Sequence, residues 1–332
     1  TLTYGPTASL QYGESGTSSA QTTTGNEWPA TGGPNNVSIY NTNGVTLHES
    51  RSINGKLTLT LGTFDNDGAS NSLSLTLADA ATISRARGML SAALVFGPSV
   101  NLIYTSTLAD VTTGFEMPTS PSVLNNLTMN TTKTVTFGSD AALNGVLTMT
   151  RGLLNLGSSN FALANSASIS GTTSATSMIV AEGSGELRKA FIAPGSFTYP
   201  LGDTTGTDDY SPVTLNFISG TFSTAYAGVK LVNAKHPSNA SGTDYLKRYW
   251  TATQNGISGF SCNADFVYAD GDIVGTESNL TLGKWDGVNW INYGAGNPAT
   301  NKLSAVGVTS FSDFTGGQPG SLPVQLVSFV GS

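Results

Sequence analysis

The residues that could carry chemistry in this chain are few and scattered. The sequence holds two histidines, His48 in a strand-like run and His236 in the loop-like segment NAKHPSN. No G-x-S-x-G motif marks a serine nucleophile. A glycosidase needs two carboxylates that converge in one cleft, whereas the acidic residues of the first half follow no repeated spacing. The sequence therefore predicts a protein that is not an enzyme.

Basic residues give no stronger signal for catalysis. A polysaccharide lyase built on a β-helix needs a basic residue beside carboxylates on one face. Arg85 and Arg87, in the segment ISRARGML, are the one local pair of this kind in the first half. We interpret both arginines as parts of a solvated strand and turn.

Two short acidic segments offer oxygen ligands for a hard cation. Asp65 and Asp67 lie in DNDG, and Asp270 and Asp272 lie in DGD. Carboxylates suit Ca²⁺, but neither segment has the full EF-hand spacing. Asp-Gly is also an ordinary turn pair. We expect turns here, with Ca²⁺ as the alternative and no other cofactor, since no P-loop, dinucleotide or haem motif is present.

Aromatic residues cluster in the segment KWDGVNWINYG, which contains Trp285, Trp290 and Tyr293. Exposed aromatic faces can stack on sugar rings. In a continuous strand the two tryptophans would point to opposite faces, whereas a hairpin turning at Asp286-Gly287 would change that. We expect these side chains in a sheet core, and the alternative is a carbohydrate-binding adhesin.

Composition excludes several classes of partner. Only 11% of the 332 residues are charged, against about 25% in ordinary proteins. The net charge of −7 and the pI near 4.7 argue against nucleic acid or an anionic membrane as partner. No apolar stretch is long enough to span a bilayer. A neutral surface rich in Ser, Thr, Asn and Gly suggests an exported protein, so we expect any targeting segment to have been removed before Thr1.

The single cysteine, Cys262, cannot form a disulfide within the chain. We expect a small buried side chain, and the alternative is a bridge between two chains.

The first half contains a duplicated block. SINGKLTLT at Ser52 matches LNGVLTMT at Leu143 with a shift of 90 residues, which pairs Leu57 with Leu147. The same shift pairs Val45 with Val135, and apolar residues alternate with Thr, Ser or Asn in both copies. Alternation of period two indicates strands. The pattern favours a parallel β-helix-like solenoid over the alternative of stacked β-sandwiches, with matched residues in equivalent rungs of one core.

From about Glu186 the repeat stops, and aromatic and charged residues become denser. Turn pairs between alternating runs predict an antiparallel β-sandwich after the solenoid. We therefore divide this all-β chain into N-terminal strands (1–26), the duplicated domain (27–183), the sandwich domain (184–318), and a linker with a C-terminal strand (319–332).

Both ends of the chain have strand-like sequences that need partners. The tail SLPVQLVSFVGS is uncharged and apolar on both strand faces, with Val324, Leu326 and Phe329 as anchors. Near the start, TLTYG and SLQYG repeat Leu-x-Tyr-Gly, with Leu2 and Tyr4 in the first copy. Strand addition to a neighbouring copy would bury such a segment. A head-to-tail contact of this kind that does not close generates a filament.

Several segments resemble large surface proteins of the Bacteroidota and their relatives. GNEWPATGGPNNVSIYNTNGVTL followed by INGKLTLT is similar to the opening of such proteins. FTYPLGD, RYWT, VTSFSDFTGG and SLPVQLVSF resemble the module before a type IX secretion sorting domain. The resemblance covers most of the chain, although each motif is short, and the chain stops at Ser332, just after this joint.

The resemblance implies export and residence at the cell surface or outside the outer membrane, but no single activity. We expect a structural protein of the cell exterior, a filament subunit that exchanges strands through its termini. Its expected partners are other copies of itself, with surface glycans in the adhesin alternative.

Overall fold

The computed structural model describes residues 2–14, 16 and 19–319 of the chain. The chain forms two compact units. The first, which we call the solenoid unit, comprises Thr1–Asn155 and Ser166–Thr173. The second unit comprises Leu156–Asn165 and the chain from Ser174 onward. No helix among the described residues is long and apolar enough to cross a membrane.

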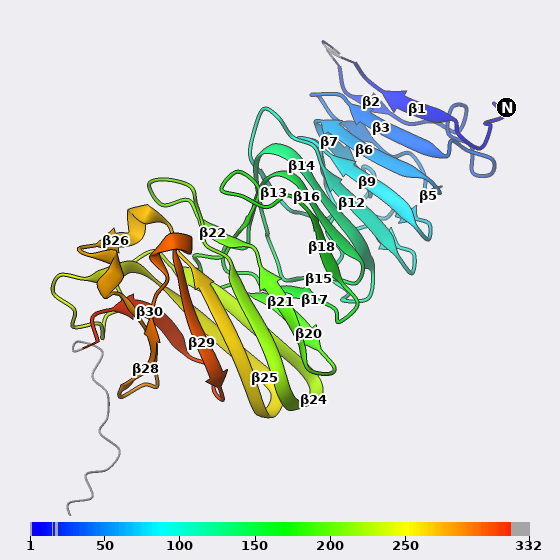
Figure 1. The fold of residues 1–332 in the computed structure, drawn as a ribbon. Coiled ribbons are helices and arrows are strands. Elements are labelled where there is room, and N and C mark those ends of the chain that lie inside the picture. The colour runs from blue at the N-terminus through cyan, green and yellow to red at the C-terminus, as the bar shows by residue number, and fades with distance from the viewer. Residues whose placement is uncertain (1, 15, 17–18, 320–332) are drawn as a thin grey trace, which may run out of the picture. The chain divides into compact units, whose positions relative to one another are not determined.

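The solenoid unit is a stack of about eight coils (Figure 1). Each coil gives one strand to a parallel sheet on the first face, and we number the coils 1 to 8 in that order. The strands of this face, in order of pairing, are β1 (Ser9–Tyr12), β3 (Asn36–Tyr40), β6 (Lys56–Leu61), β9 (Ala81–Arg85), β12 (Val100–Tyr104), β14 (Leu124–Thr136), β16 (Val146–Asn155) and β18 (Ser168–Gly171).

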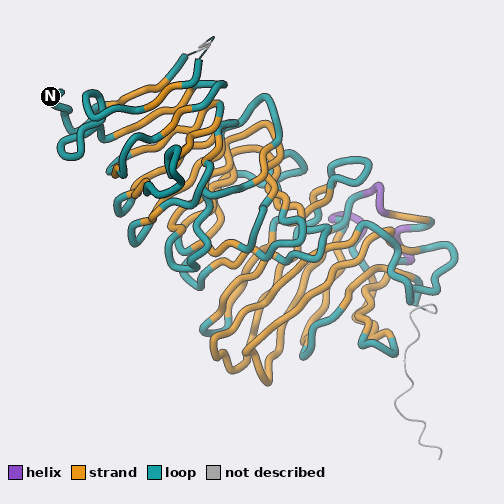
Figure 2. Tube along the Cα trace, turned by 180° about the vertical axis from the view of Figure 1, so that it is seen from behind, coloured by secondary structure: helices purple, strands orange, loops and turns teal. Residues whose placement is uncertain are grey.

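Shorter strands form the other two faces, and loops join them at the corners of the coils (Figure 2). The second face holds β2 (Gln21–Thr22), β4 (Val45–Thr46), β7 (Thr63–Asp65), β10 (Met89–Leu90) and β13 (Val111–Thr112), and continues through the later parts of β14 and β16. The third face holds β5 (Arg51–Ile53), β8 (Leu75–Leu77), β11 (Val95–Phe96) and β15 (Ala141–Leu143).

Coils 1 and 5 differ from coils 2, 3, 4 and 6 at the third face. Each replaces the strand there with a long loop, residues 23–35 in coil 1 and residues 113–123 in coil 5. The ladder of the third face is therefore interrupted between β11 and β15.

One ladder of apolar side chains runs through all the coils and explains the fold. Strand alternation turns these residues inward, and parallel pairing in register stacks each on the next. Leu57 and Leu147 are fully buried, and Val45 and Val135 are at most 1% exposed, as the duplication predicted. The ladder consists of Leu10, Val37, Leu57, Ile83, Leu102, Leu127, Leu147 and Ile169.

The predicted solenoid is confirmed, and it replaces the alternative of stacked sandwiches in this half. A shift of 90 residues corresponds to four coils, because Leu57 lies in coil 3 and Leu147 lies in coil 7. Residues 9–12, which the sequence division placed before the repeat, form coil 1 of the same stack.

The second unit is built mainly from antiparallel strands, although two parallel pairs, β17–β20 and β19–β22, make its sheets mixed. Three 3₁₀ turns are the helical elements of its described part: η1 (Asp270–Asp272), η2 (Glu277–Asn279) and η3 (Pro298–Thr300). Its strands are β17 (Phe161–Leu163), β19 (Ile179–Val180), β20 (Leu187–Phe191), β21 (Gly195–Tyr199), β22 (Leu201–Asp203), β23 (Asp209–Tyr210), β24 (Val213–Val232), β25 (Tyr245–Val267), β26 (Ile273–Val274), β27 (Thr281–Trp285), β28 (Trp290–Ala295), β29 (Lys302–Val308) and β30 (Asp313–Gly317).

Strand β25 doubles back on itself together with its partner β24. The rings of Trp250 and Phe266, both in β25, lie 5.3 Å apart. A straight strand would separate them by about 50 Å, at roughly 3.3 Å per residue. Gly256 and Gly259 lie between them with φ of +69° and +58°, a conformation that favours glycine. The two halves of the paired strands β24 and β25, before and after this bend, therefore face each other across one aromatic core.

Candidate functional site

Arg85 lies inside the solenoid, so its interpretation as a solvated strand residue was wrong. It occupies an inward position of β9, beside Leu59 of coil 3 and Tyr104 of coil 5. Only 5% of Arg85 is exposed. Period two requires this placement, because Ile83, two residues earlier, also points inward. Arg87, by contrast, is partly exposed.

Glu116 is the partner that makes a buried arginine tolerable here. Its carboxylate, in the loop of coil 5, forms a buried ion pair with Arg85. The hydroxyl of Tyr104 donates to Glu116 Oε1 at 2.9 Å, and the amide of Gly114 donates to both carboxylate oxygens at 3.1 Å. Burial and the negative charge of Glu116 raise the pKa of Tyr104 well above its usual value.

Arg85 also donates hydrogen bonds to two backbone carbonyl groups. Its Nε donates to the carbonyl of Gly88 at 2.9 Å, and its Nη1 donates to the carbonyl of Thr112 at 2.8 Å. Every oxygen of Glu116 is thus bonded, and the carboxylate is almost fully buried. Such a carboxylate has no free oxygen for acid–base chemistry, so the network positions the loop.

The same arrangement occurs in coil 1, four coils earlier. Tyr12 occupies the same inward position of its first-face strand as Tyr104 does, and it donates its hydroxyl to Glu27 at 3.1 Å. The backbone amide of Thr24 donates to the same carboxylate. The loops share a G-x-E-x-P motif, at Gly25–Pro29 and Gly114–Pro118. The motif directly follows Thr112-Thr113 in coil 5, whereas one further residue, Thr24, separates it from Thr22-Thr23 in coil 1.

Equivalent threonines hold the start of each loop. Thr23 Oγ1 accepts a hydrogen bond from the amide of His48 at 3.1 Å, and Thr113 Oγ1 accepts one from the amide of Gly138 at 2.9 Å. His48 and Gly138 are themselves 90 residues apart. The four-coil repeat therefore includes these loops, which the sequence comparison had not extended to, and the repeated TT…G-x-E-x-P motif was the signal that it missed.

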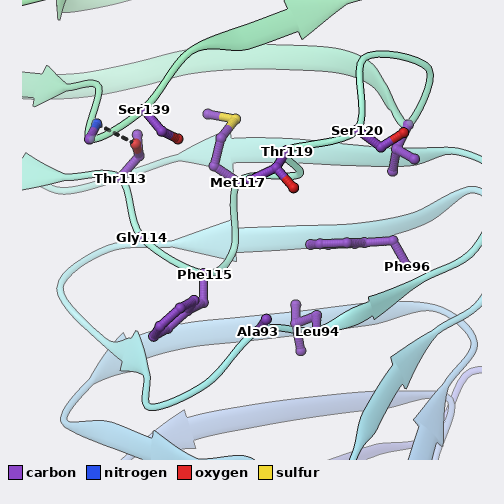
Figure 3. A pocket seen from close by; sticks show the side chains of 12 residues that line it. Ala93, Leu94, Phe96, Thr113, Gly114, Phe115, Met117, Thr119, Ser120 and Ser139 are labelled. Atoms are coloured by element: carbon purple, nitrogen blue, oxygen red, sulfur yellow. Dashed lines mark hydrogen bonds between the residues drawn. The ribbon is translucent and has the colours of Figure 1, made fainter. Parts of the chain in front are cut away.

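A hollow of about 480 Å³ lies beside the loop of coil 5, where the third face has no strand (Figure 3). We call it the coil-5 groove. Phe96 from β11 and Phe115 from the loop flank it, and 48% of Phe115 is exposed. The groove is lined by Ala93, Leu94, Phe96, Thr113, Gly114, Phe115, Met117, Thr119, Ser120, Val123, Gly138 and Ser139.

None of the residues that line the coil-5 groove carries a charge. Thr119 and Ser139 are exposed and make no hydrogen bond to any residue that the structure describes. The groove therefore combines aromatic and aliphatic surfaces with hydroxyl groups that can donate and accept hydrogen bonds. Such a surface can bind a neutral polar ligand, and it offers no charged group for catalysis.

The tryptophans singled out from the sequence lie together, but they are largely enclosed. β27 and β28 form a hairpin in which Trp285 and Trp290 are directly paired, with ring centroids 5.3 Å apart. Trp290 is 2% exposed, and its indole N–H donates to the carbonyl of Ser238 at 3.0 Å. Tyr293 is partly exposed. A smaller fraction of each tryptophan is exposed than of Phe115.

Of the two acidic pairs, Asp65 and Asp67 meet at one hydroxyl, whereas Asp270 and Asp272 point different ways. Asp67 accepts a hydrogen bond from Ser91 at 2.8 Å, and Asp65 lies near the same hydroxyl. Asp270 is exposed, whereas Asp272 points inward. Among residues 2–14, 16 and 19–319, no group of three or more His, Cys, Asp or Glu side chains could hold a metal ion.

Asp272 belongs instead to a buried cluster around Arg248. The guanidinium of Arg248 lies 3.2 Å from Asp272 and bonds Asp203 and Ser211. Arg248 and Asp203 are fully buried. Burial raises the pKa of Asp203 to about 6, although the charge of Arg248 opposes this shift.

Both histidines have their ring nitrogens occupied. His236 Nδ1 accepts from the amide of Ser238 at 3.1 Å, and its Nε2 lies 3.2 Å from Asp313. His48 Nδ1 contacts Thr23 Oγ1, and its Nε2 contacts Arg51 Nη2 at 2.8 Å. Burial and the charge of Arg51 lower the pKa of His48. Neither ring has a nitrogen free to act as a base.

The terminal residues proposed for assembly fall into two groups. Leu2 and Tyr4 lie outside any strand: Leu2 is 56% exposed, and the hydroxyl of Tyr4 donates to the carbonyl of Glu27. Val324, Leu326 and Phe329 lie outside the described residues.

Comparison with known proteins adds no assignment: no family model, no curated protein and no solved structure matches this chain.

Proposed function

We propose that this protein is an extracellular or cell-surface structural protein that assembles through the first coil of its solenoid. In this proposal coil 1 accepts an added strand from a second copy, and the C-terminal segment Val324–Val330 is the donor. The second unit, with the two-layer β-sandwich expected from its sequence, carries that segment. Repetition of the contact would give a filament.

The observation that carries the proposal is that coil 1 repeats an interior coil. Coil 5, which shares its tyrosine, loop and glutamate, is stacked between coils 4 and 6. β1 pairs with β3 on one side, and on the other side it pairs with no strand of residues 2–319 that the structure describes. Solenoid ends normally need a cap, and a bare parallel edge is a template for strand addition.

The tail sequence supports the same contact. Val324–Val330 has no charge and no proline, and it alternates in a way that suits a strand covered on both faces. The resemblance of SLPVQLVSF and its neighbouring motifs to type IX secretion substrates supports a location outside the cell. A neutral surface without an available catalytic group supports a structural role.

The test is assembly of the purified chain with and without its tail. We expect the full chain to form regular fibres by negative-stain electron microscopy and fast-sedimenting species by analytical ultracentrifugation. Deletion of Leu322–Ser332 should leave monomers with unchanged circular dichroism. Fibres that persist after the deletion would contradict the donor role of the tail.

A proline at the edge of β1 tests the acceptor. The carbonyl of Ala8 accepts from Asn36 of β3, and peptide groups of alternate residues point to opposite edges of a strand, so the amide of Gln11 points to the open edge. Gln11→Pro should abolish assembly without loss of a β1–β3 hydrogen bond, whereas Gln11→Ala should assemble normally. Equal assembly by both variants would argue against coil 1 as the acceptor.

A further inference from the structure

We propose that the coil-5 groove is a binding site for a neutral oligosaccharide, with the ring of Phe115 stacking on a sugar. This inference does not rest on the self-assembly proposal, because the groove lies at coil 5 and away from the open edge of coil 1. It also places glycan recognition at residues other than Trp285 and Trp290.

The loop that carries Phe115 is held in place by buried contacts on both sides of that residue. Gly114 and Glu116, its two neighbours, are joined by the amide-to-carboxylate bonds at 3.1 Å. Glu116 is also fixed by Arg85 and Tyr104. A buried ion pair seldom adds net stability, so its value here lies in positioning. A rigid support lowers the entropy lost when Phe115 contacts a ligand.

Packing of the core does not explain why Phe115 is present, because its ring is not buried. The neighbouring side chains Glu116 and Met117 are at most 3% exposed, whereas Phe115 is 48% exposed at the edge of a hollow. Aromatic rings with one open face are suited to contacts with the apolar faces of flat ligands. Pockets of 300–1,000 Å³, roughly, accept small ligands, and the volume of about 480 Å³ lies in this range.

The chemistry of the groove selects a neutral, hydroxyl-rich ligand. All twelve lining residues are uncharged, so a charged ligand would lose hydration without gaining an ion pair. Thr119 and Ser139 provide hydroxyls with no partner among the described residues. A neutral sugar presents an apolar ring face to Phe115 or Phe96 and hydroxyls to these groups.

Coil 1 provides a natural comparison within the same chain. Its loop repeats the motif, but Asn26 stands where coil 5 has Phe115, and Trp28 stands where coil 5 has Met117. Trp28 is buried, and the hollow beside this loop measures about 90 Å³. The two loops share their support and differ in the exposed ring and in the open space. Because both coils have the buried tyrosine–glutamate contacts, we attribute these contacts to folding. Because only coil 5 has an exposed ring beside an open hollow, we attribute ligand binding to Phe115.

The experiment is isothermal titration calorimetry of the full chain with neutral hexasaccharides of glucose, mannose, galactose and xylose. We expect at least one to bind, and Phe115→Ala to weaken that binding by about tenfold or more, the loss of a stacking contact. Phe115→Trp should keep the affinity, because it keeps the ring. Asn26→Ala, at the equivalent position of coil 1, should bind as the parent chain does.

Matched measurements separate the proposal from its rivals. The Phe115→Ala chain should retain its unfolding temperature, because the side chain is half exposed, and Gln11→Pro should bind the sugar as the parent does. The proposal is overturned if none of the hexasaccharides binds, if Phe115→Ala binds equally well, or if only sulfated sugars or an apolar dye bind the groove.

Discussion

Tyr12 and Tyr104 occupy the same position of the solenoid, four coils apart, and each donates its hydroxyl to the glutamate of its own coil's loop. The two glutamates have different surroundings. Glu116 pairs with Arg85 of the coil before it, whereas no coil precedes Glu27 among the described residues. Coil 1 therefore repeats the strand, the loop and the tyrosine–glutamate hydrogen bond of coil 5, but it lacks an arginine from a preceding coil.

Removal of Glu116 should be among the most harmful single changes in the solenoid unit. Glu116→Ala leaves Arg85 buried without its carboxylate, which should lower the free energy of unfolding by about 3–5 kcal/mol. Urea unfolding followed by circular dichroism measures this. The double variant Arg85→Leu/Glu116→Leu should lose less than Glu116→Ala, and Arg87→Ala should change little. A double variant as unstable as the single one would show that charge burial is not the cause.

The two halves of the repeat should respond alike to cavities in the core. Leu57→Ala and Leu147→Ala each remove a fully buried side chain from the same ladder position. We expect each to cost about 2–5 kcal/mol in urea unfolding. Thr58→Ala and Thr148→Ala, one residue away and facing outward, are the controls and should change stability by less than about 1 kcal/mol. A small effect of either leucine change would contradict equivalent packing.

Cys262 should behave as an inert thiol in the native protein. It is fully buried, and burial raises its pKa to about 12. The thiolate is the reactive form, so Ellman's reagent should not react at mildly alkaline pH until the chain unfolds in guanidinium chloride. The structure thus favours the buried side chain over a bridge between chains. A fast reaction of the folded chain, or a dimer that dithiothreitol dissociates, would show the opposite.

Lys189 should make stability rise with pH in the alkaline range. Its Nζ donates to the carbonyls of Ala164 and Asn165, and burial lowers its pKa from 10.5 to about 8. Below pH 8 both the native and the unfolded chain carry this proton, and the buried charge has its full cost. Between pH 8 and 10.5 the native chain has lost the proton while the unfolded chain still holds it, so stability rises through this window.

The comparison of Lys189→Met with the parent isolates this effect. The stability of the parent relative to Lys189→Met should increase by on the order of 1–3 kcal/mol as pH rises through the window. Chemical unfolding at a series of pH values provides the measurement, with Lys230→Met as the control, because Lys230 is a partly exposed lysine on β24. A constant difference between the parent and Lys189→Met would contradict the lowered pKa.

Strand alternation was enough to predict the solenoid. The inward residues of the first face are apolar except at a few places, and the shift of 90 residues could be read from short matches such as the one that pairs Leu57 with Leu147. The same alternation placed Arg85 inward, but its charge argued for solvent. Its partner Glu116 is 31 residues away, and pairwise sequence matching does not show which distant charges meet.

The site was harder to predict for a related reason. A groove forms at coil 5 because one face of the solenoid lacks a strand there, and no single residue type marks such a gap. Phe115 looks like any other loop aromatic in the sequence, and its importance follows only from its exposure beside the hollow. The tryptophans, by contrast, stood out in the sequence because their residue type is rare, and folding uses Trp290 in the core.

The equivalence of coils 1 and 5 also sets a fixed spacing between equivalent loops along the solenoid. Adjacent parallel strands lie about 4.8 Å apart, so four coils advance the stack by about 19 Å. The two loops recur at that interval on the same side of the stack. A chain with further four-coil blocks would gain reach in steps of this size, and each block that carried Phe rather than Asn in its loop would add one sugar-binding position. Affinity for a long polysaccharide would then grow by multivalent attachment.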